Sequence, residues 1–191
     1  MRRTPNAEDD TVCRAPEILT ERLRLRGHRP DDLDARSAIT ADSEVCRFTG
    51  GTLQSREDNW ARIQRYAGQW VLDGFGLFAV EDRARGCFVG EVGLGRFGRG
   101  LGADFDAAPE AAWMLAPDLH GRGFAREAVT AALAWHEGRF GPSRTVCCIA
   151  DENAPSLALA VRLGFRPFRN AAYRDRPAIL LERLPFDAEA G

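Results

Sequence analysis

The chain has 191 residues, 45% of them apolar and 28% charged, and its formal net charge is −2. This length fits one domain with a sizeable core, and the nearly balanced charge gives no global positive field of the kind that favours nucleic-acid binding. All 26 basic residues are arginines, which excludes any mechanism that needs a lysine.

The cysteines and the polar N-terminal residues indicate a reduced protein without a membrane anchor. The five cysteines form no C-x-x-C pair and are odd in number, which argues against a disulfide framework or a zinc site. The first residues lack the apolar core of a signal peptide, and no apolar run approaches the ~20 residues that span a bilayer. We therefore expect a cytoplasmic protein with no metal ion and with neither a nucleic acid nor a membrane as its partner.

The first half of the chain predicts a tail, a strand, two helices and a hairpin. Residues 1–16 are expected to form a loose tail, and residues 17–191 a single domain. Ile18 to Arg26 alternates as a half-buried strand, with leucines on one face and Arg22, Arg24 and Arg26 on the other. The next predicted elements are a helix over Asp31–Thr40, a chain break at Gly50-Gly51, a helix from the capping box of Ser55 to about Trp70, and strands over Phe75–Glu81 and Cys87–Val92.

The second half predicts alternating strands and helices. A glycine-rich stretch and an acidic loop with Asp104 and Asp106 come first. The further predicted elements are a strand over Glu110–Leu115, a helix from Gly123 to about Arg139, a strand over Thr145–Ala150, a helix from the cap Asn153 to Gly164, and strands over Arg166–Tyr173 and Ala178–Leu184. A β-α-β-α unit implies a parallel strand pair, and the hairpins imply antiparallel pairs. The expected fold is therefore α/β, a mixed sheet covered by helices.

The segment Leu119-His120-Gly121-Arg122-Gly123-Phe124-Ala125 joins the strand at Glu110–Leu115 to the following helix. The first amides of a helix have no partners within it, and the helix dipole adds partial positive charge there. Glycines in such a turn let the backbone approach a bound group closely. The segment therefore predicts a phosphate or pyrophosphate site.

Two other phosphate-binding motifs are excluded. The P-loop, G-x-x-x-x-G-K-[ST], needs a lysine. The sequence Gly93-Leu94-Gly95-Arg96-Phe97-Gly98 matches G-x-G-x-x-G, but the residues after it, Arg99-Gly100-Leu101-Gly102, will not start a helix. We expect a bulged strand end and a loop there.

The six residues His120 to Ala125 resemble the Gln/Arg-x-x-Gly-x-Gly/Ala mark of the GCN5-related N-acetyltransferase (GNAT) family, with His120 in place of the usual glutamine or arginine. Three more segments resemble the RimJ/RimL-like branch: Ile18–Arg26, Glu110–Leu115, and Asn153-Ala154-Pro155-Ser156 leading to Leu163-Gly164-Phe165. The resemblance covers residues 17–185. It implies a twisted mixed sheet of about seven strands flanked by about four helices, with a splayed parallel strand pair that holds the cofactor.

The resemblance implies acetyl-CoA as the cofactor, with its pyrophosphate on the amides of the turn. The strand at Trp113–Ala116 is expected to bulge and to receive the pantetheine arm, and an amide near Met114 to stabilise the oxyanion. The residues implied to bind the cofactor are Trp113, Met114, Leu115, Ala116, His120, Gly121, Arg122, Gly123, Phe124, Ala125, Asn153 and Ser156. For His120 a plain surface position, and for Asn153 plain helix capping, remain open alternatives.

Two residues are implied to carry the catalysis. Glu110 lies where relatives often have a glutamate that serves as general base, although an ordinary strand-end carboxylate is the alternative. Ala160 lies where many relatives have a tyrosine as general acid. Ser156 is the nearest substitute for protonating the thiolate, and Tyr173 is a further hydroxyl in reach by sequence order.

The expected activity is direct transfer of an acetyl group to a primary amine, either a protein N-terminal amine or a small-molecule amine. Asp104 and Asp106 are candidates to attract a cationic amine, and Phe48, Trp60, Trp70 and Phe97 to form the walls of the acceptor site. The alternative is a non-catalytic acyl-CoA-binding or regulatory module. Homodimers are common among such relatives, so a homodimer is a further possibility.

Overall fold

A computed structural model describes residues 14–48 and 53–185. Most of the predicted N-terminal tail and the predicted break at Gly50-Gly51 lie outside the described residues. The strands are β1 (Ile18–Leu19), β2 (Leu23–Arg26), β3 (Leu77–Asp82), β4 (Cys87–Gly95), β5 (Glu110–Leu115), β6 (Thr145–Ala150), β7 (Arg166–Tyr173) and β8 (Arg176–Arg183). The helices are α1 (Asp32–Thr40), α2 (Ser43–Phe48), α3 (Arg56–Asp73), α4 (Ala103–Asp106), α5 (Phe124–Phe140) and α6 (Ala154–Arg162), with a 3₁₀ turn η1 (Pro117–Leu119).

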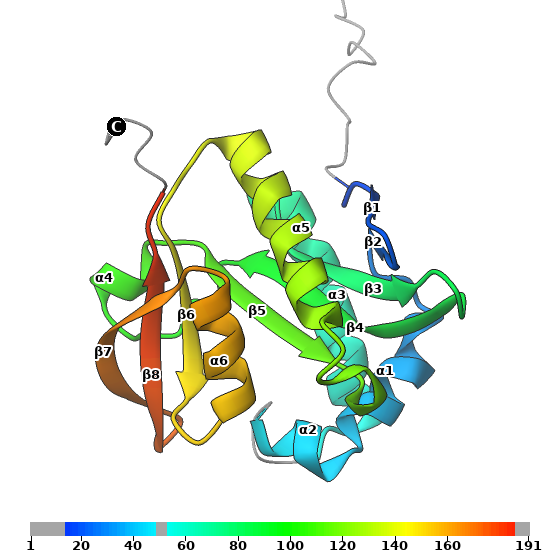
Figure 1. The fold of residues 1–191 in the computed structure, drawn as a ribbon. Coiled ribbons are helices and arrows are strands. Elements are labelled where there is room, and N and C mark those ends of the chain that lie inside the picture. Colours follow the sequence, from blue (N-terminus) through cyan, green and yellow to red (C-terminus); the bar gives the residue numbers. More distant parts are fainter. Residues whose placement is uncertain (1–13, 49–52, 186–191) are drawn as a thin grey trace, which may run out of the picture.

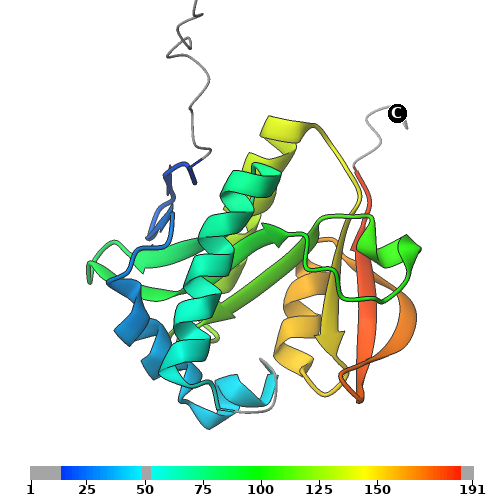
Figure 2. The same cartoon turned by 180° about the vertical axis from the view of Figure 1, so that it is seen from behind.

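All eight strands form one mixed sheet in the order β1-β2-β3-β4-β5-β6-β8-β7. Helices α5 and α6 cover one face, and α1 and α3 cover the other (Figures 1 and 2). The predicted α/β class and mixed sheet are confirmed. The described residues hold one strand and two helices more than expected, because the first strand is split and α2 and α4 were not predicted.

The predicted single strand over Ile18–Arg26 is wrong, since β1 and β2 form an antiparallel hairpin. The chain bends between them because Glu127 of α5 accepts hydrogen bonds from the Thr20 hydroxyl at 2.6 Å and the Arg22 amide at 2.8 Å. Arg26 is buried instead of facing solvent. Its guanidinium is paired with Asp32 at 2.7 Å and with Glu81 at 2.8 Å, which compensates the buried charge.

Of the three glycines of the G-x-G-x-x-G match, Gly93 and Gly95 lie inside β4 and Gly98 lies in the loop after it. No helix begins directly after them, in agreement with the rejection of a dinucleotide site. The acidic residues predicted to lie in a loop instead form the single turn of α4. Asp106 accepts a hydrogen bond from the Gly102 amide at the start of that turn, which helps to close it.

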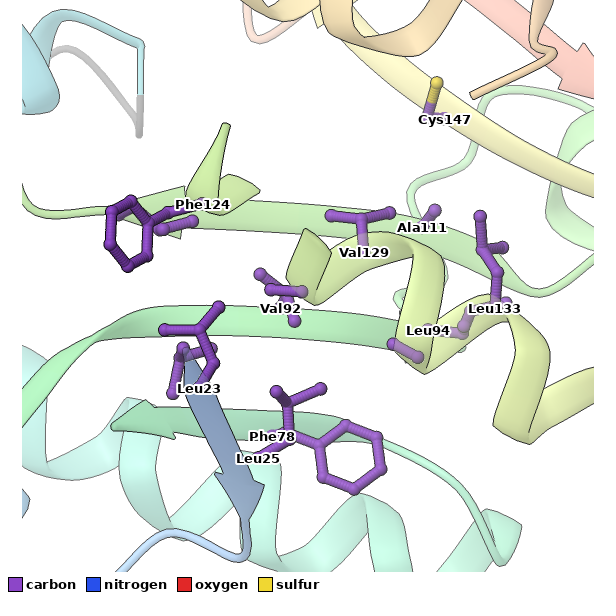
Figure 3. Packing of buried hydrophobic residues seen from close by; sticks show 14 of the residues in the cluster. Leu23, Leu25, Phe78, Val92, Leu94, Ala111, Phe124, Val129, Leu133 and Cys147 are labelled. Carbon is purple, nitrogen blue, oxygen red and sulfur yellow. The ribbon is translucent and has the colours of Figure 1, made fainter. Parts of the chain in front are cut away.

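The main core lies between the sheet and α5. Figure 3 shows Leu23, Val92 and Leu94 of the sheet together with Val129 and Leu133 of the helix. All five side chains are buried. Burial of each such side chain contributes about 1.5–3 kcal/mol, and this packing holds α5 on the sheet.

The parallel pair β5 and β6 separates almost at once. Only one pair of residues, Glu110 and Val146, is in register between these strands. Beyond it the strands diverge toward the start of α5 (Figure 1). The predicted splayed pair is therefore present. The predicted bulge is absent, because β5 keeps a continuous register with β4 from Glu110 to Leu115.

Helix α3 begins with the predicted capping box. Ser55 accepts a hydrogen bond from the Asp58 amide at 3.1 Å, and the Asp58 carboxylate accepts one from the Ser55 amide at 2.9 Å. The helix ends at Gly74, which adopts a left-handed conformation with φ +74°. Both ends of α3 therefore follow from residues in the local sequence.

Replacing the cap should measurably weaken the fold. We expect Ser55→Ala to lower the free energy of unfolding by about 1 kcal/mol, because the N-terminal turn of α3 loses the side chain that caps it. Ser37→Ala is the control, since Ser37 only donates to the Leu33 carbonyl within α1, and its loss should be nearly neutral. Urea unfolding of both variants checks this, and equal losses would contradict the capping role.

Candidate active site

The turn before α5 presents unpaired backbone amides. Gly121 and Gly123 have φ of +72° and +80°, values that residues with a Cβ rarely adopt. Gly123 is the N-cap of α5, and no side chain caps this helix end. Within the described residues, none of the amides of residues 121–125 donates a hydrogen bond. Because such amides attract anions, the turn fits a pyrophosphate.

His120 ties this turn to the preceding strand. Its Nε2 lies 3.0 Å from the Leu115 carbonyl oxygen at the end of β5. The imidazole therefore helps to set the path from strand to helix. A direct contact of His120 with phosphate stays a prediction.

Arg22 is a residue of this site that sequence reasoning missed. Its guanidinium lies 4.0 Å from the centre of the Phe124 ring and donates to the Arg122 carbonyl at 2.9 Å. A Cβ at Gly123 would lie 3.5 Å from its Nη2. It lies beside the amides, and its charge is paired with Glu127, whose carboxylate lies 2.6 Å from its Nε. The contact joins residues about 100 positions apart, so no local pattern could reveal it.

The strands β5 and β6 diverge, and we call the space between them the gap. Alternate residues of β5 turn their backbone groups toward this gap. The Ala116 amide donates to the Val89 carbonyl at 2.8 Å, and the ladder from β4 to β5 continues without a bulge. In an antiparallel ladder successive residues point their amides to opposite sides. The Met114 amide therefore points toward β4, whereas those of Trp113 and Leu115 point toward the gap. The predicted oxyanion donor near Met114 stays a prediction, for which the amides of Trp113 and Leu115 have the suitable direction.

Trp113, Asn153 and Ser156 meet on the side of the gap that carries α6. The Trp113 indole donates to the Ser156 hydroxyl at 3.3 Å, which links β5 with the first turn of α6. Asn153 caps α6, since its side-chain oxygen accepts from the Ser156 amide at 3.2 Å. The predicted capping role of Asn153 is confirmed. The structure brings these three residues together, and their predicted contact with the cofactor stays a prediction.

A cavity of about 550 Å³ lies on the other side of the gap. Ala112 and Met114 of β5 and Cys148 and Ala150 of β6 line it. Its outer walls come from α3, from the loop after β4 and from the turn between β7 and β8. The gap therefore lies between the turn with unpaired amides on one face of the sheet and a cavity on the opposite face.

The sequence matches the family description "Acetyltransferase (GNAT) domain" over residues 22–166. The chain belongs to the GNAT acetyltransferase family. Members of this family bind acetyl-CoA, and the unpaired amides and the open strand edge fit that cofactor. The predicted recognition, enzyme class and cofactor are thus confirmed.

Similar proteins agree with this assignment. The N-acetyltransferase YnaD of Bacillus subtilis, itself uncharacterised, is 26% identical over 149 residues, which cover 78% of this chain and 82% of YnaD. A structure from Bordetella pertussis described as a GNAT-family acetyltransferase is 35% identical, with a TM-score of 0.79, and covers 88% of this chain and 99% of its own.

More distant structures share the fold. The spermidine N-acetyltransferase of Vibrio cholerae, in complex with CoA and spermine, is 19% identical with a TM-score of 0.66, covering 87% of this chain and 97% of its own. Ribosomal-protein acetyltransferases are also among the structural neighbours. This GNAT protein therefore shares its fold with acetyltransferases of the RimJ/RimL kind.

Glu110 is buried at the start of β5 and covered by Arg99. The Arg99 Nε lies 2.7 and 2.6 Å from the two carboxylate oxygens. Burial raises the pKa of Glu110, and the Arg99 guanidinium acts in the opposite direction. Arg99 lines the cavity, whereas Glu110 does not. The carboxylate therefore reaches the cavity only past Arg99.

Glu91 is the carboxylate that lines the cavity itself. It is buried in β4, and Arg36 donates to both of its oxygens at 3.0 Å. Burial opposes its ionisation, but the neighbouring His28 and the Arg36 guanidinium outweigh burial and lower the pKa of Glu91 to about 2. With so low a pKa and with Arg36 on both oxygens, Glu91 is a weak base and a structural anion.

Cys148 lines the cavity next to the gap, where a nucleophilic thiol would be well placed. Burial raises its pKa to about 11, so that the thiol stays protonated near neutral pH. The neighbouring Cys147 is buried, and its pKa is raised as well. Neither cysteine has the thiolate character that a covalent acetyl carrier needs.

We expect Cys148→Ser to keep the rate of acetyl transfer within about threefold of the wild type, because the thiol is not ionised. Initial rates at saturating acetyl-CoA check this. A loss of about 100-fold or more in an intact protein would show that the thiol takes part in the reaction.

The acidic residues predicted to attract the acceptor do not line the cavity. Asp104 pairs with Arg169 at 3.1 Å and Asp106 closes the turn of α4. Of the predicted aromatic walls, Phe48 and Phe97 line the cavity. Trp70 is instead buried in the core, and Trp60 lies in a separate hollow beside Pro30 and Leu33.

The described residues offer neither a membrane-spanning helix nor a metal site. None of the helices there combines the length and apolarity needed to cross a membrane. Residues 14–48 and 53–185 likewise contain no cluster of three or more His, Cys, Asp or Glu side chains arranged to hold a metal ion.

Proposed function

We propose that this GNAT protein transfers the acetyl group of acetyl-CoA directly to a primary amine bound in the cavity. The observation that carries the proposal is the gap between β5 and β6. It joins unpaired amides suited to a pyrophosphate to a separate cavity large enough for a second substrate. Two substrates can therefore meet in one complex, without an acetylated enzyme.

The backbone of β5 is proposed to hold the cofactor arm and the reacting oxygen. When bound, acetyl-CoA supplies an activated acetyl thioester with a thiolate leaving group. The Trp113 and Leu115 amides face the gap, where they can pair with the pantetheine amides as a neighbouring strand would. We assign to one of them the hydrogen bond to the carbonyl oxygen on which negative charge develops.

Glu110 and Ser156 are proposed to move the protons. An alkyl amine is mostly protonated at neutral pH. A base must therefore accept a proton from the amine before the amine attacks the thioester carbonyl. Glu110 is that base in our proposal, through a water beside Arg99, and its burial favours this role by raising its pKa. Ser156, whose hydroxyl lies at the gap beside Trp113, is proposed to donate a proton to the departing sulfur.

Release of free CoA thiol tests the proposed function. The protein is given acetyl-CoA together with small amines or short peptides with a free N-terminus. We expect release to depend on the amine and to saturate with it. Tight CoA binding with no amine-dependent release would contradict the proposal and favour a non-catalytic binding module.

A further inference from the structure

The cavity that would take the acceptor is lined by an excess of cationic side chains. Six of its lining residues are arginines, whereas Glu91 is the one carboxylate among the described residues that line it. The arginines are Arg36, Arg62, Arg65, Arg99, Arg174 and Arg176. The protein as a whole has a net charge of −2, so this concentration of positive charge is local.

Three of these arginines already have carboxylate partners. Arg36 is paired with Glu91, Arg99 with Glu110, and Arg176 with Glu152. Their charges are thus largely compensated within the fold.

The other three, Arg62, Arg65 and Arg174, form no ion pair with any described residue. Arg65 donates to the Phe97 carbonyl at 3.2 Å. No described residue accepts a hydrogen bond from the guanidinium of Arg62 or of Arg174. Arg62 is half-buried on α3. Guanidinium groups at a cavity wall that have no carboxylate partner are suited to bind a carboxylate or a phosphate of a ligand.

The backbone conformation of Arg174 supports a role of this residue at the mouth of the cavity. Arg174 and Asp175 join β7 to β8 and have φ of +53° and +60°. Two-residue turns of this kind favour glycine and asparagine, because a longer side chain is strained in the left-handed region. The chain nevertheless has an arginine there. Strain held at a cavity mouth is typical of functional sites.

From these observations we infer that the acceptor is a primary amine that also carries an anionic group, a carboxylate or a phosphate, which Arg62 and Arg174 bind. This inference rests on the proposed function and names the substrate class of the same cavity. A polycationic amine is disfavoured, because Glu91 is held by Arg36 and like charges in a cavity repel. The surrounding arginines also favour the neutral, nucleophilic form of the reacting amine.

The same arginines are poorly placed to bind the cofactor phosphates. Arg62 lies on α3, on the opposite face of the sheet from the unpaired amides that begin α5 (Figures 1 and 2). Arg174 lies on the turn between β7 and β8, at the end of these strands and apart from the start of α5. Removing either arginine should therefore affect the acceptor and leave CoA binding unchanged.

Matched acceptors that differ by one negative charge test the inference. The pairs are a free amino acid against its amide, and a peptide with acidic residues after its N-terminus against the same peptide with amides there; spermidine is the polycation. In at least one pair, we expect kcat/KM to be about tenfold or more higher for the anionic acceptor than for its neutral counterpart. This factor corresponds to the free energy of one charge-assisted hydrogen bond. The pair that shows the preference tells a small molecule from a peptide.

The variants Arg62→Ala and Arg174→Ala should each reduce that preference by about threefold or more and leave the CoA dissociation constant unchanged. Arg139→Ala, an exposed arginine at the end of α5, is the control and should change neither. A kcat/KM for the neutral acceptors or for spermidine that equals or exceeds that for the anionic acceptors would overturn this inference but not the proposed function. Weaker CoA binding with an unchanged acceptor preference would also overturn it, whereas no transfer to any amine would overturn the proposed function.

Discussion

Gly123→Val should lower the affinity for CoA by at least about 100-fold, because it removes the backbone geometry that presents the amides of the turn. Gly123 has φ +80°, which a β-branched residue does not tolerate. A Cβ there has room, with Arg22 as its nearest neighbour at 3.5 Å, so the strain comes from the backbone and not from a clash. Losing two charge-assisted amide bonds costs about 3–6 kcal/mol, which is roughly 100-fold or more in affinity.

Gly138→Val is the matched control in the same helix. Gly138 lies in the last turns of α5 and has no positive φ, and a Cβ added there would meet no atom within 4 Å. Valine is tolerated in a helix about as well as glycine or better, so this variant should bind CoA normally. Isothermal titration with CoA, together with urea unfolding, compares the two. Normal affinity in a folded Gly123→Val protein would show that the pyrophosphate binds elsewhere.

Glu110→Gln should lower kcat by about 100- to 10,000-fold, the usual contribution of a general base. CoA affinity should not change, because Glu110 lies at the other end of β5 from the phosphate-binding turn. Glu182→Gln is the matched control, since Glu182 is also a strand carboxylate paired with an arginine, Arg144, at 2.7 Å. Steady-state rates of both variants check this. A Glu110→Gln rate within about threefold of the wild type would exclude this residue as the base.

The pH dependence of the rate should identify the same carboxylate. A base acts in its ionised form, so kcat of the wild type should rise with pH through the pKa of Glu110. Arg99 lowers that pKa against the effect of burial. Arg99→Leu should therefore raise it and move the rising limb of the profile to higher pH. A shift to lower pH, or none, would contradict the pairing of Arg99 with the catalytic base.

Local features of this site could be predicted from the sequence, because their physical causes lie within a few residues. The capping box of Ser55 with Asp58, the cap Asn153 and the glycine turn before α5 each depend on neighbours only a few positions apart. The parallel pair of β5 and β6 followed from the order of strands and helices. The turn and the cap Asn153 lie beside the gap between β5 and β6, and the capping box begins the helix that walls the cavity.

The acceptor side could not be predicted, because its contacts join distant segments. The pair Arg36 with Glu91, which lines the cavity, links residues 55 positions apart. Nothing in the local pattern of Asp104 showed that Arg169 would engage it. The sequence therefore suggested an acidic acceptor site, whereas the folded cavity is lined by arginines.

Direct transfer to an amine is the central claim, and mass spectrometry of both protein and acceptor tests it most directly. The protein is first mixed with acetyl-CoA alone, and the acceptor is added afterwards. We predict that the protein keeps its unmodified mass throughout and that one acetylated amine appears for each CoA released. An acetylated protein formed before the amine is added, or CoA released without acetylated amine, would contradict direct transfer.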